Sequence, residues 1–110
     1  IAQEQIEEML PLPADLTGDG DLFMLRVRGD SMVDAGILDG DFVVARVQTT
    51  AEKGEIVVAG IPGEEATVKT FRRKGSTIVL EPSNPTMEPM VFDPSDVQVY
   101  GKVVTVLRKL

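Results

Sequence analysis

The chain contains no histidine, cysteine or tryptophan, and aromatic residues make up only 5% of its 110 residues. Without histidine, a Ser-His-Asp triad is excluded. Without cysteine, thiolate catalysis and a disulfide framework are excluded too, and the lack of disulfides suits a cytoplasmic protein. No apolar run approaches the roughly 18 residues of a membrane span, and no signal-peptide pattern opens the sequence. We therefore expect a cytoplasmic protein with no membrane partner.

Positive charge is also scarce. Eleven lysines and arginines stand against eighteen aspartates and glutamates, which gives a formal net charge of −7. Such a surface repels phosphate groups, so we expect this chain by itself to be a poor nucleic-acid binder. The 43% hydrophobic content is typical of one soluble globular domain.

From residue 22 onward, β-prone segments alternate with turn residues. Candidate strands cover residues 22–27, 41–47, 56–61, 66–72, 77–80 and, at the end of the chain, 96–110. Turn signals separate the first five strands: Asp39-Gly40, Lys53-Gly54, Pro62-Gly63 and Lys74-Gly75. Connections this short join antiparallel neighbours, and four prolines between residues 82 and 94 indicate an irregular loop. The predicted fold is mainly β, a compact single domain of antiparallel hairpins.

Residues 1–21 differ from the remainder and are predicted to form an N-terminal arm, with residues 22–110 as the folded domain. Asp15, Thr17 and Asp19 match the first positions of a calcium-binding EF-hand loop. The twelfth position, however, holds Arg26 where a bidentate glutamate is required. We therefore expect no metal and no other cofactor.

Ser31 is the first candidate for chemistry. It follows the strand of residues 22–27 and the chain break at Gly29, a placement that presents a hydroxyl at the end of a rigid element. A serine at a bend is usually just a turn former. If Ser31 is a nucleophile, the absence of histidine leaves a lysine, a carboxylate or the terminal amine as its base, and a Ser-Lys pair is a known alternative to the triad.

Lys69 is the lysine best placed to act as that base. It lies in the middle of a predicted strand, on the same face as Thr67 and Phe71. Apolar neighbours disfavour the ammonium form and lower the pKa of a lysine. The remaining lysines lie in turns, at the chain end or at the start of the last strand: Lys53, Lys74, Lys109 and Lys102.

The two positions together resemble the Ser-Lys peptidase domain of the LexA and UmuD family. The resemblance rests on Gly29-Asp30-Ser31-Met32 and on Thr67-Val68-Lys69, and it extends in the same order through residues 34–41, 54–59 and 99–104. It implies that Ser31 is the nucleophile and that neutral Lys69 is the general base. The backbone N–H groups of Ser31 and Met32 are the implied donors to the oxyanion.

The resemblance also implies a biological role. The chain would be the C-terminal catalytic and dimerisation domain of a transcriptional repressor of the SOS response to DNA damage. In that family, RecA filaments on single-stranded DNA promote cleavage of the protein's own Ala-Gly bond upstream of the nucleophile. No segment before Ser31 matches that cleavage loop, so we expect this chain to lack its own scissile bond. A UmuD-like accessory subunit of an error-prone DNA polymerase and a non-catalytic dimerisation module are the alternatives.

The apolar terminal strand, residues 96–110, is a candidate for contacts between two copies of the chain. A strand at a chain end is often an edge that pairs with another chain, although it can instead be captured inside its own sheet. In the resembled family this end contributes to a homodimer with two-fold symmetry. The candidate interface residues are Val99, Tyr100, Val103, Val104 and Val106.

Overall fold

The computed structural model describes residues 12–110, apart from the side chain of Glu65. Residues 1–11 of the predicted arm lie outside the described residues. Within the remainder of the arm, Ala14–Thr17 form α1, a single short helical turn. No helix in residues 12–110 has the length and apolar character needed to cross a membrane.

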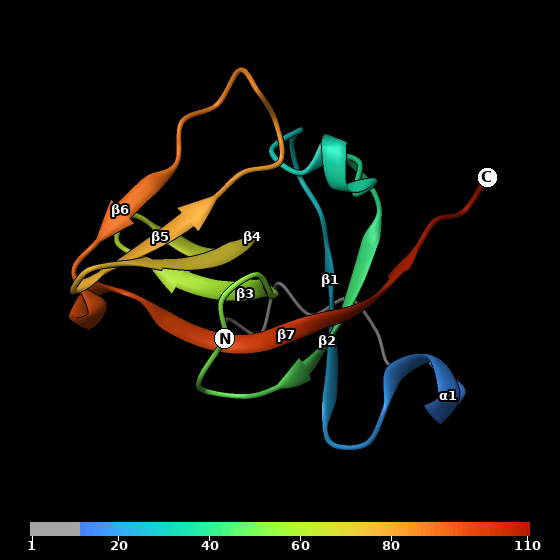
Figure 1. Ribbon diagram of the computed structural model, residues 1–110. Coiled ribbons are helices and arrows are strands. Elements are labelled where there is room, and N and C mark those ends of the chain that lie inside the picture. Colours follow the sequence, from blue (N-terminus) through green and yellow to red (C-terminus); the bar gives the residue numbers. More distant parts are fainter. Residues whose placement is uncertain (1–11) are drawn as a thin grey trace.

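Within residues 12–110, seven strands form one antiparallel sheet in the order β1-β2-β7-β3-β4-β5-β6 (Figure 1). Their bounds are Leu22–Arg26 for β1, Phe42–Val47 for β2, Ile56–Ile61 for β3, Glu64–Lys74 for β4, Thr77–Glu81 for β5, Met90–Phe92 for β6 and Gln98–Leu107 for β7. The predicted mainly β fold of antiparallel strands is confirmed. The hairpins at Pro62-Gly63 and Lys74-Gly75 join β3 to β4 and β4 to β5, as expected from those turn residues.

Two local expectations were wrong. Asp39-Gly40 does not close a tight hairpin, because β1 and β2 pair from Arg26 and Phe42 outward and leave residues 27–41 as a long loop. The proline-rich segment is not wholly irregular, since it contains β6 and a 3-10 turn, Pro94–Asp96. The terminal strand β7, for which both an edge position and a position inside the sheet were open, lies between β2 and β3.

The long strand β7 ties the two ends of the sheet together. In Figure 1 it runs past β1 and β2 at one end and past β3 at the other. At Gly101, β7 is paired on both sides, since this residue lies opposite Val47 of β2 and opposite Val58 of β3. A Cβ atom at this position would lie 2.6 Å from the carbonyl oxygen of Arg46 and 2.8 Å from Cε1 of Phe23. Only glycine permits this close approach of backbones.

The core of the described part of the chain consists of two apolar clusters. The first contains Phe23 of β1 together with Met32 and Ile37 from the loop between β1 and β2. The second contains Phe71 and Leu80 from the β4–β5 hairpin. The loop that carries Ser31 is therefore fixed by residues of the main core, an uncommon situation for a surface connection.

Candidate functional site

Ser31 and Lys69, which are distant in sequence, line the same cleft. The cleft has a volume of about 650 Å³. One wall consists of residues 25–32, from the end of β1 into the following loop, and the other consists of residues of β4. Met87, from the loop after β5, also lines the cleft. The sheet thus brings the two predicted catalytic side chains to one concave site.

The nucleophile loop, residues 27–41, is closed at its base by hydrogen bonds. The N–H of Val27 donates to the carbonyl of Asp41 at 2.7 Å, and the N–H of Gly40 donates to the carbonyl of Val27 at 2.9 Å. The Asp39 carboxylate accepts from the N–H of Gly29 at 2.7 Å. Gly29 has a φ of 85°, which a glycine adopts without strain. These contacts hold Ser31 on a defined scaffold.

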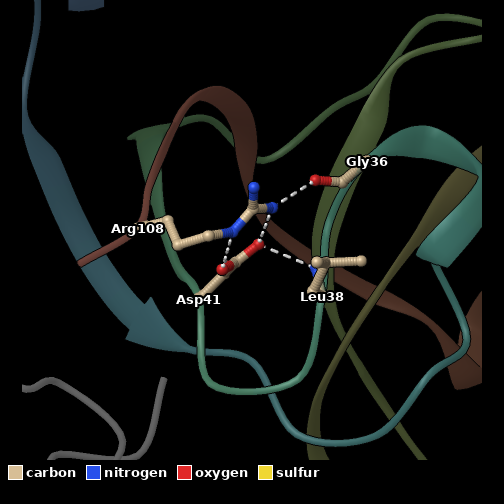
Figure 2. Close-up of polar contacts among 4 residues, drawn as sticks. All are labelled: Gly36, Leu38, Asp41 and Arg108. Atoms are coloured by element: carbon tan, nitrogen blue, oxygen red, sulfur yellow. Dashed lines mark hydrogen bonds and ion pairs between the residues drawn. The ribbon is translucent and has the colours of Figure 1, made fainter. Parts of the chain in front are cut away.

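An ion pair between the buried Asp41 and the exposed Arg108 fixes the second half of the nucleophile loop (Figure 2). Arg108 donates to both carboxylate oxygens of Asp41 at 2.8 Å, and its Nη2 also donates to the carbonyl of Gly36 at 2.9 Å. The N–H of Leu38 donates to the same carboxylate at 2.7 Å. The hydrogen bond from Arg108, followed by that from Leu38, lowers the pKa of Asp41. A bidentate pair of this kind is geometrically demanding, so it fixes the loop conformation.

Met32 anchors the candidate nucleophile, Ser31. Its side chain is only 1% exposed and packs in the first core cluster with Ile37 and Val43. The adjacent Ser31 is half-buried and lines the cleft. Within residues 12–110, the backbone N–H groups of Ser31 and Met32 donate no hydrogen bond. Both groups are therefore free to bind an oxyanion.

Lys69 is half-buried in β4, opposite Val57 of β3. Its Nζ donates a hydrogen bond to Oγ1 of the buried Thr67 at 2.7 Å. Desolvation lowers the pKa of Lys69, and the charge of Glu64 opposes this shift. No hydrogen bond links Lys69 to Ser31 in the described part of the chain, and contacts between catalytic groups often form only when substrate is bound.

The lowered pKa predicts a pH-dependent effect of Lys69→Met on stability. Charging Lys69 costs more in the folded than in the unfolded chain. This cost is absent well above the ordinary value of 10.5, where the amine is neutral in both states. It grows as the pH falls from 10.5 to the lower folded pKa, and it is constant below the folded pKa. The stability of Lys69→Met relative to wild type should therefore rise as the pH falls below 10.5 and level off below the folded pKa of Lys69.

Urea denaturation at several pH values measures this difference. Lys53→Met is the matched control because Lys53 is exposed in a turn. A stability difference between Lys69→Met and wild type that stays constant across this pH range would contradict a depressed pKa.

The predicted interface residues of β7 fall into two groups. Val99 is 7% exposed within the second core cluster, and Tyr100 and Val103 pack against the first. These side chains serve the chain's own core, and the structure offers no support for an interface role of Val99. Val104 is half-buried and Val106 is 38% exposed, so these two remain candidates.

The sequence analysis missed the loop after β5. Its residues Ser83 and Asn84 contact the nucleophile loop, and Met87 lines the cleft. The one available signal was the Asn84-Pro85 pair, which marks a turn but does not indicate what the turn contacts.

The chain is similar in sequence to known proteins over its whole length. A peptidase S24-like family model matches residues 1–104. Over all 110 residues, the chain is 54% identical to LexA repressor 2 of Nocardia farcinica and 54% identical to the LexA repressor of Acidothermus cellulolyticus. It is 53% identical to the LexA repressor of Mycobacterium tuberculosis. The chain covers 44%, 39% and 45% of these relatives, so it spans less than half of their length.

Proposed function

Since this chain belongs to the peptidase S24-like family and is similar over its whole length to LexA repressors, we propose that Ser31 and Lys69 form its catalytic dyad. The observation that carries the proposal is that both residues line one cleft, where burial lowers the pKa of Lys69. The reaction is hydrolysis of a peptide bond by a serine endopeptidase.

Each step uses groups of this cleft. Neutral Lys69 accepts the proton of the Ser31 hydroxyl while the serine oxygen attacks the peptide carbonyl. The N–H groups of Ser31 and Met32 bind the oxyanion that develops. Lys69 then passes the proton to the departing amine, which leaves an acyl-enzyme on Ser31. Water then attacks the ester while Lys69 accepts a proton from it, and Lys69 returns this proton to the Ser31 oxygen as the acyl bond to that oxygen breaks.

The substrate we propose is an extended segment of the parent repressor that carries an Ala-Gly bond. β1 supports this choice because it is an edge strand, paired in the described residues with β2 alone, and its last residues line the cleft. An extended peptide can add to such an edge by backbone hydrogen bonds. Cleavage of the parent chain would be autoproteolytic, and RecA filaments on single-stranded DNA are the proposed activator.

The wider role follows from the relatives. We propose a cytoplasmic repressor of DNA-damage genes in the SOS response, with DNA bound by a domain outside this sequence. The whole-length similarity to LexA repressors favours this role over that of a UmuD-like polymerase subunit.

Cleavage of a synthetic peptide in trans tests the proposal. Wild-type chain should cut a peptide at its Ala-Gly bond, with the products identified by mass spectrometry, and Ser31→Ala should not. Ser76→Ala is the control because Ser76 is exposed in the turn between β4 and β5. Cleavage that persists in Ser31→Ala would refute the dyad, and binding without cleavage by wild type would favour a non-catalytic module.

We also propose that the end of β7 forms a homodimer. β2 pairs with β7 as far as Leu107, whereas β3 pairs with it only as far as Lys102. Among the described residues, positions 103–107 therefore have strand pairing on one side only. Two copies of this segment can pair antiparallel about a two-fold axis.

Val106→Lys should weaken this dimer by about tenfold or more, because it places like charges near the two-fold axis. Sedimentation equilibrium measures the dissociation constant. Val91→Lys is the matched control, since Val91 is 61% exposed on the other edge strand, β6. Dissociation caused by Val91→Lys and not by Val106→Lys would assign the interface to β6 instead.

A further inference from the structure

The loop after β5 contacts the nucleophile loop through two consecutive residues. The side-chain amide of Asn84 donates to the carbonyl of Asp30 at 2.8 Å. The N–H of Ser83 donates to the carbonyl of Ser31 at 2.8 Å. The carbonyl of Ser83 accepts from the N–H of Asp34 at 2.8 Å. Two of the three contacts thus end on the carbonyls immediately before and at the candidate nucleophile.

These two carbonyls share peptide planes with the candidate oxyanion donors. The carbonyl of Asp30 and the N–H of Ser31 belong to one peptide group, and the carbonyl of Ser31 and the N–H of Met32 belong to the next. The described chain has no cis peptide bond, so each N–H points opposite to its carbonyl. Fixing both carbonyls from the side of Ser83 and Asn84 therefore directs both N–H groups away from that side.

The side chain of Asn84 is itself held in place. Its Oδ1 accepts from the N–H of Thr86 at 2.9 Å and from the hydroxyl of Thr86 at 2.7 Å. The carbonyl of Asn84 also accepts from the N–H of Met87 at 3.1 Å. With Oδ1 committed to this turn, Nδ2 is left to face Asp30. The amide is thus oriented before any substrate binds.

From this geometry we propose that Asn84, together with the backbone of Ser83, is a positioning element for the oxyanion hole. It sets the planes of the two peptide groups whose N–H bonds stabilise the transition state. A hydrogen bond to a peptide carbonyl also polarises the N–H of the same group, which strengthens it as a donor. The inference rests on the proposed function, because it assigns a purpose to the same Ser31 and Met32 donors.

The variants Asn84→Ala and Asn84→Asp test this role. Alanine removes the amide entirely. Aspartate keeps the Oδ1 acceptor for Thr86 but replaces the donor to Asp30 with an oxygen that repels the carbonyl. Both variants should lower kcat for cleavage of an Ala-Gly peptide by about 10- to 100-fold, because misdirected donors lose transition-state stabilisation. KM should change by less than about twofold, since the oxyanion exists only in the transition state.

The pH dependence of the cleavage rate separates positioning from a general structural defect. Neither Ser83 nor Asn84 hydrogen-bonds Lys69 in residues 12–110. In the Asn84 variants, the maximal rate reached at high pH should therefore fall, while the pH at which half of that rate is reached should stay the same. Asp93→Ala is the matched control. Asp93 accepts from the N–H and the hydroxyl of Ser95 in a similar turn, but it does not line the cleft. Its kcat should equal that of wild type.

Measuring Ser31→Ala in parallel distinguishes failure of the positioning role from failure of the proposed function. If wild type cleaves, Ser31→Ala does not, and both Asn84 variants keep kcat within about twofold, the positioning role is wrong while the dyad stands. A loss confined to KM, or a shift of the pH midpoint together with the plateau, would also overturn it. If wild type does not cleave the peptide at all, the proposed function and the positioning role both fall.

Discussion

Lys69→Ala is expected to reduce peptide cleavage by at least about 10³-fold. The chain has no histidine that could replace it. The carboxylates that line the cleft belong to Asp30 and Glu64, and both residues are exposed. Lys69 is the cleft amine that burial biases toward its neutral, proton-accepting form. Its removal leaves the Ser31 hydroxyl without an activated path for its proton.

Initial rates of peptide cleavage measure this effect across the variants. Ser31→Ala should be as inactive as Lys69→Ala, and the double variant should be no worse than either, because the two groups act as a unit. Lys53→Ala serves as the control for loss of an exposed lysine and should retain full activity. A Lys69→Ala variant with more than about a tenth of wild-type activity would assign the base to another group.

Met32→Ala is expected to lower the free energy of unfolding by about 2–5 kcal/mol. The side chain is 1% exposed and is one of the largest fully buried side chains in the described chain. Its truncation leaves a cavity between the nucleophile loop and the sheet. Because Met32 adjoins Ser31, the remaining folded protein should also cleave more slowly.

Chemical denaturation gives the stability difference, with Met87→Ala as the matched control. Met87 is 42% exposed, so its truncation should change stability by no more than about 0.5 kcal/mol. Met32→Leu, which conserves volume, should recover most of the loss. A Met32→Ala variant destabilised by less than about 1 kcal/mol would contradict the anchoring role.

The sequence was sufficient to predict the local elements of secondary structure. β3 begins and ends at the predicted residues 56 and 61, because apolar β-branched residues are bounded there by Lys53-Gly54 and Pro62-Gly63. Lys69 was identified from strand alternation, and the structure places it beside Thr67 as that alternation requires. Hydrophobic periodicity and turn residues involve only residues that are close in sequence, so a single sequence is enough to recognise them.

The order of the strands could not be obtained in this way. β7 enters between β2 and β3, although β2 and β3 are neighbours in sequence. Its apolar composition suits an edge in a dimer and an interior strand equally well. Long-range pairing is decided by packing in the whole sheet, including the close approach of Gly101 to Arg46 and Phe23.

The contacts that support Ser31 could not be predicted from the sequence either, because they also join residues that are far apart in the chain. Asp41 and Arg108 are 67 residues apart, and Asp30 and Asn84 are 54 residues apart. A buried aspartate of this kind is indistinguishable in sequence from the many exposed acids around it. Geometry alone connects these residues to the catalytic proposal.

The central claim is that a neutral Lys69 activates Ser31, and an NMR titration of the Lys69 side chain tests it most directly. With Nζ and Cε isotope-labelled and assigned by comparison with Lys69→Met, the resonance should titrate below the ordinary value of 10.5. The rate of peptide cleavage should rise with pH through the same midpoint and then level off. Titration at or above 10.5, or a cleavage rate that stays flat from about pH 6 to about pH 10, would contradict the claim.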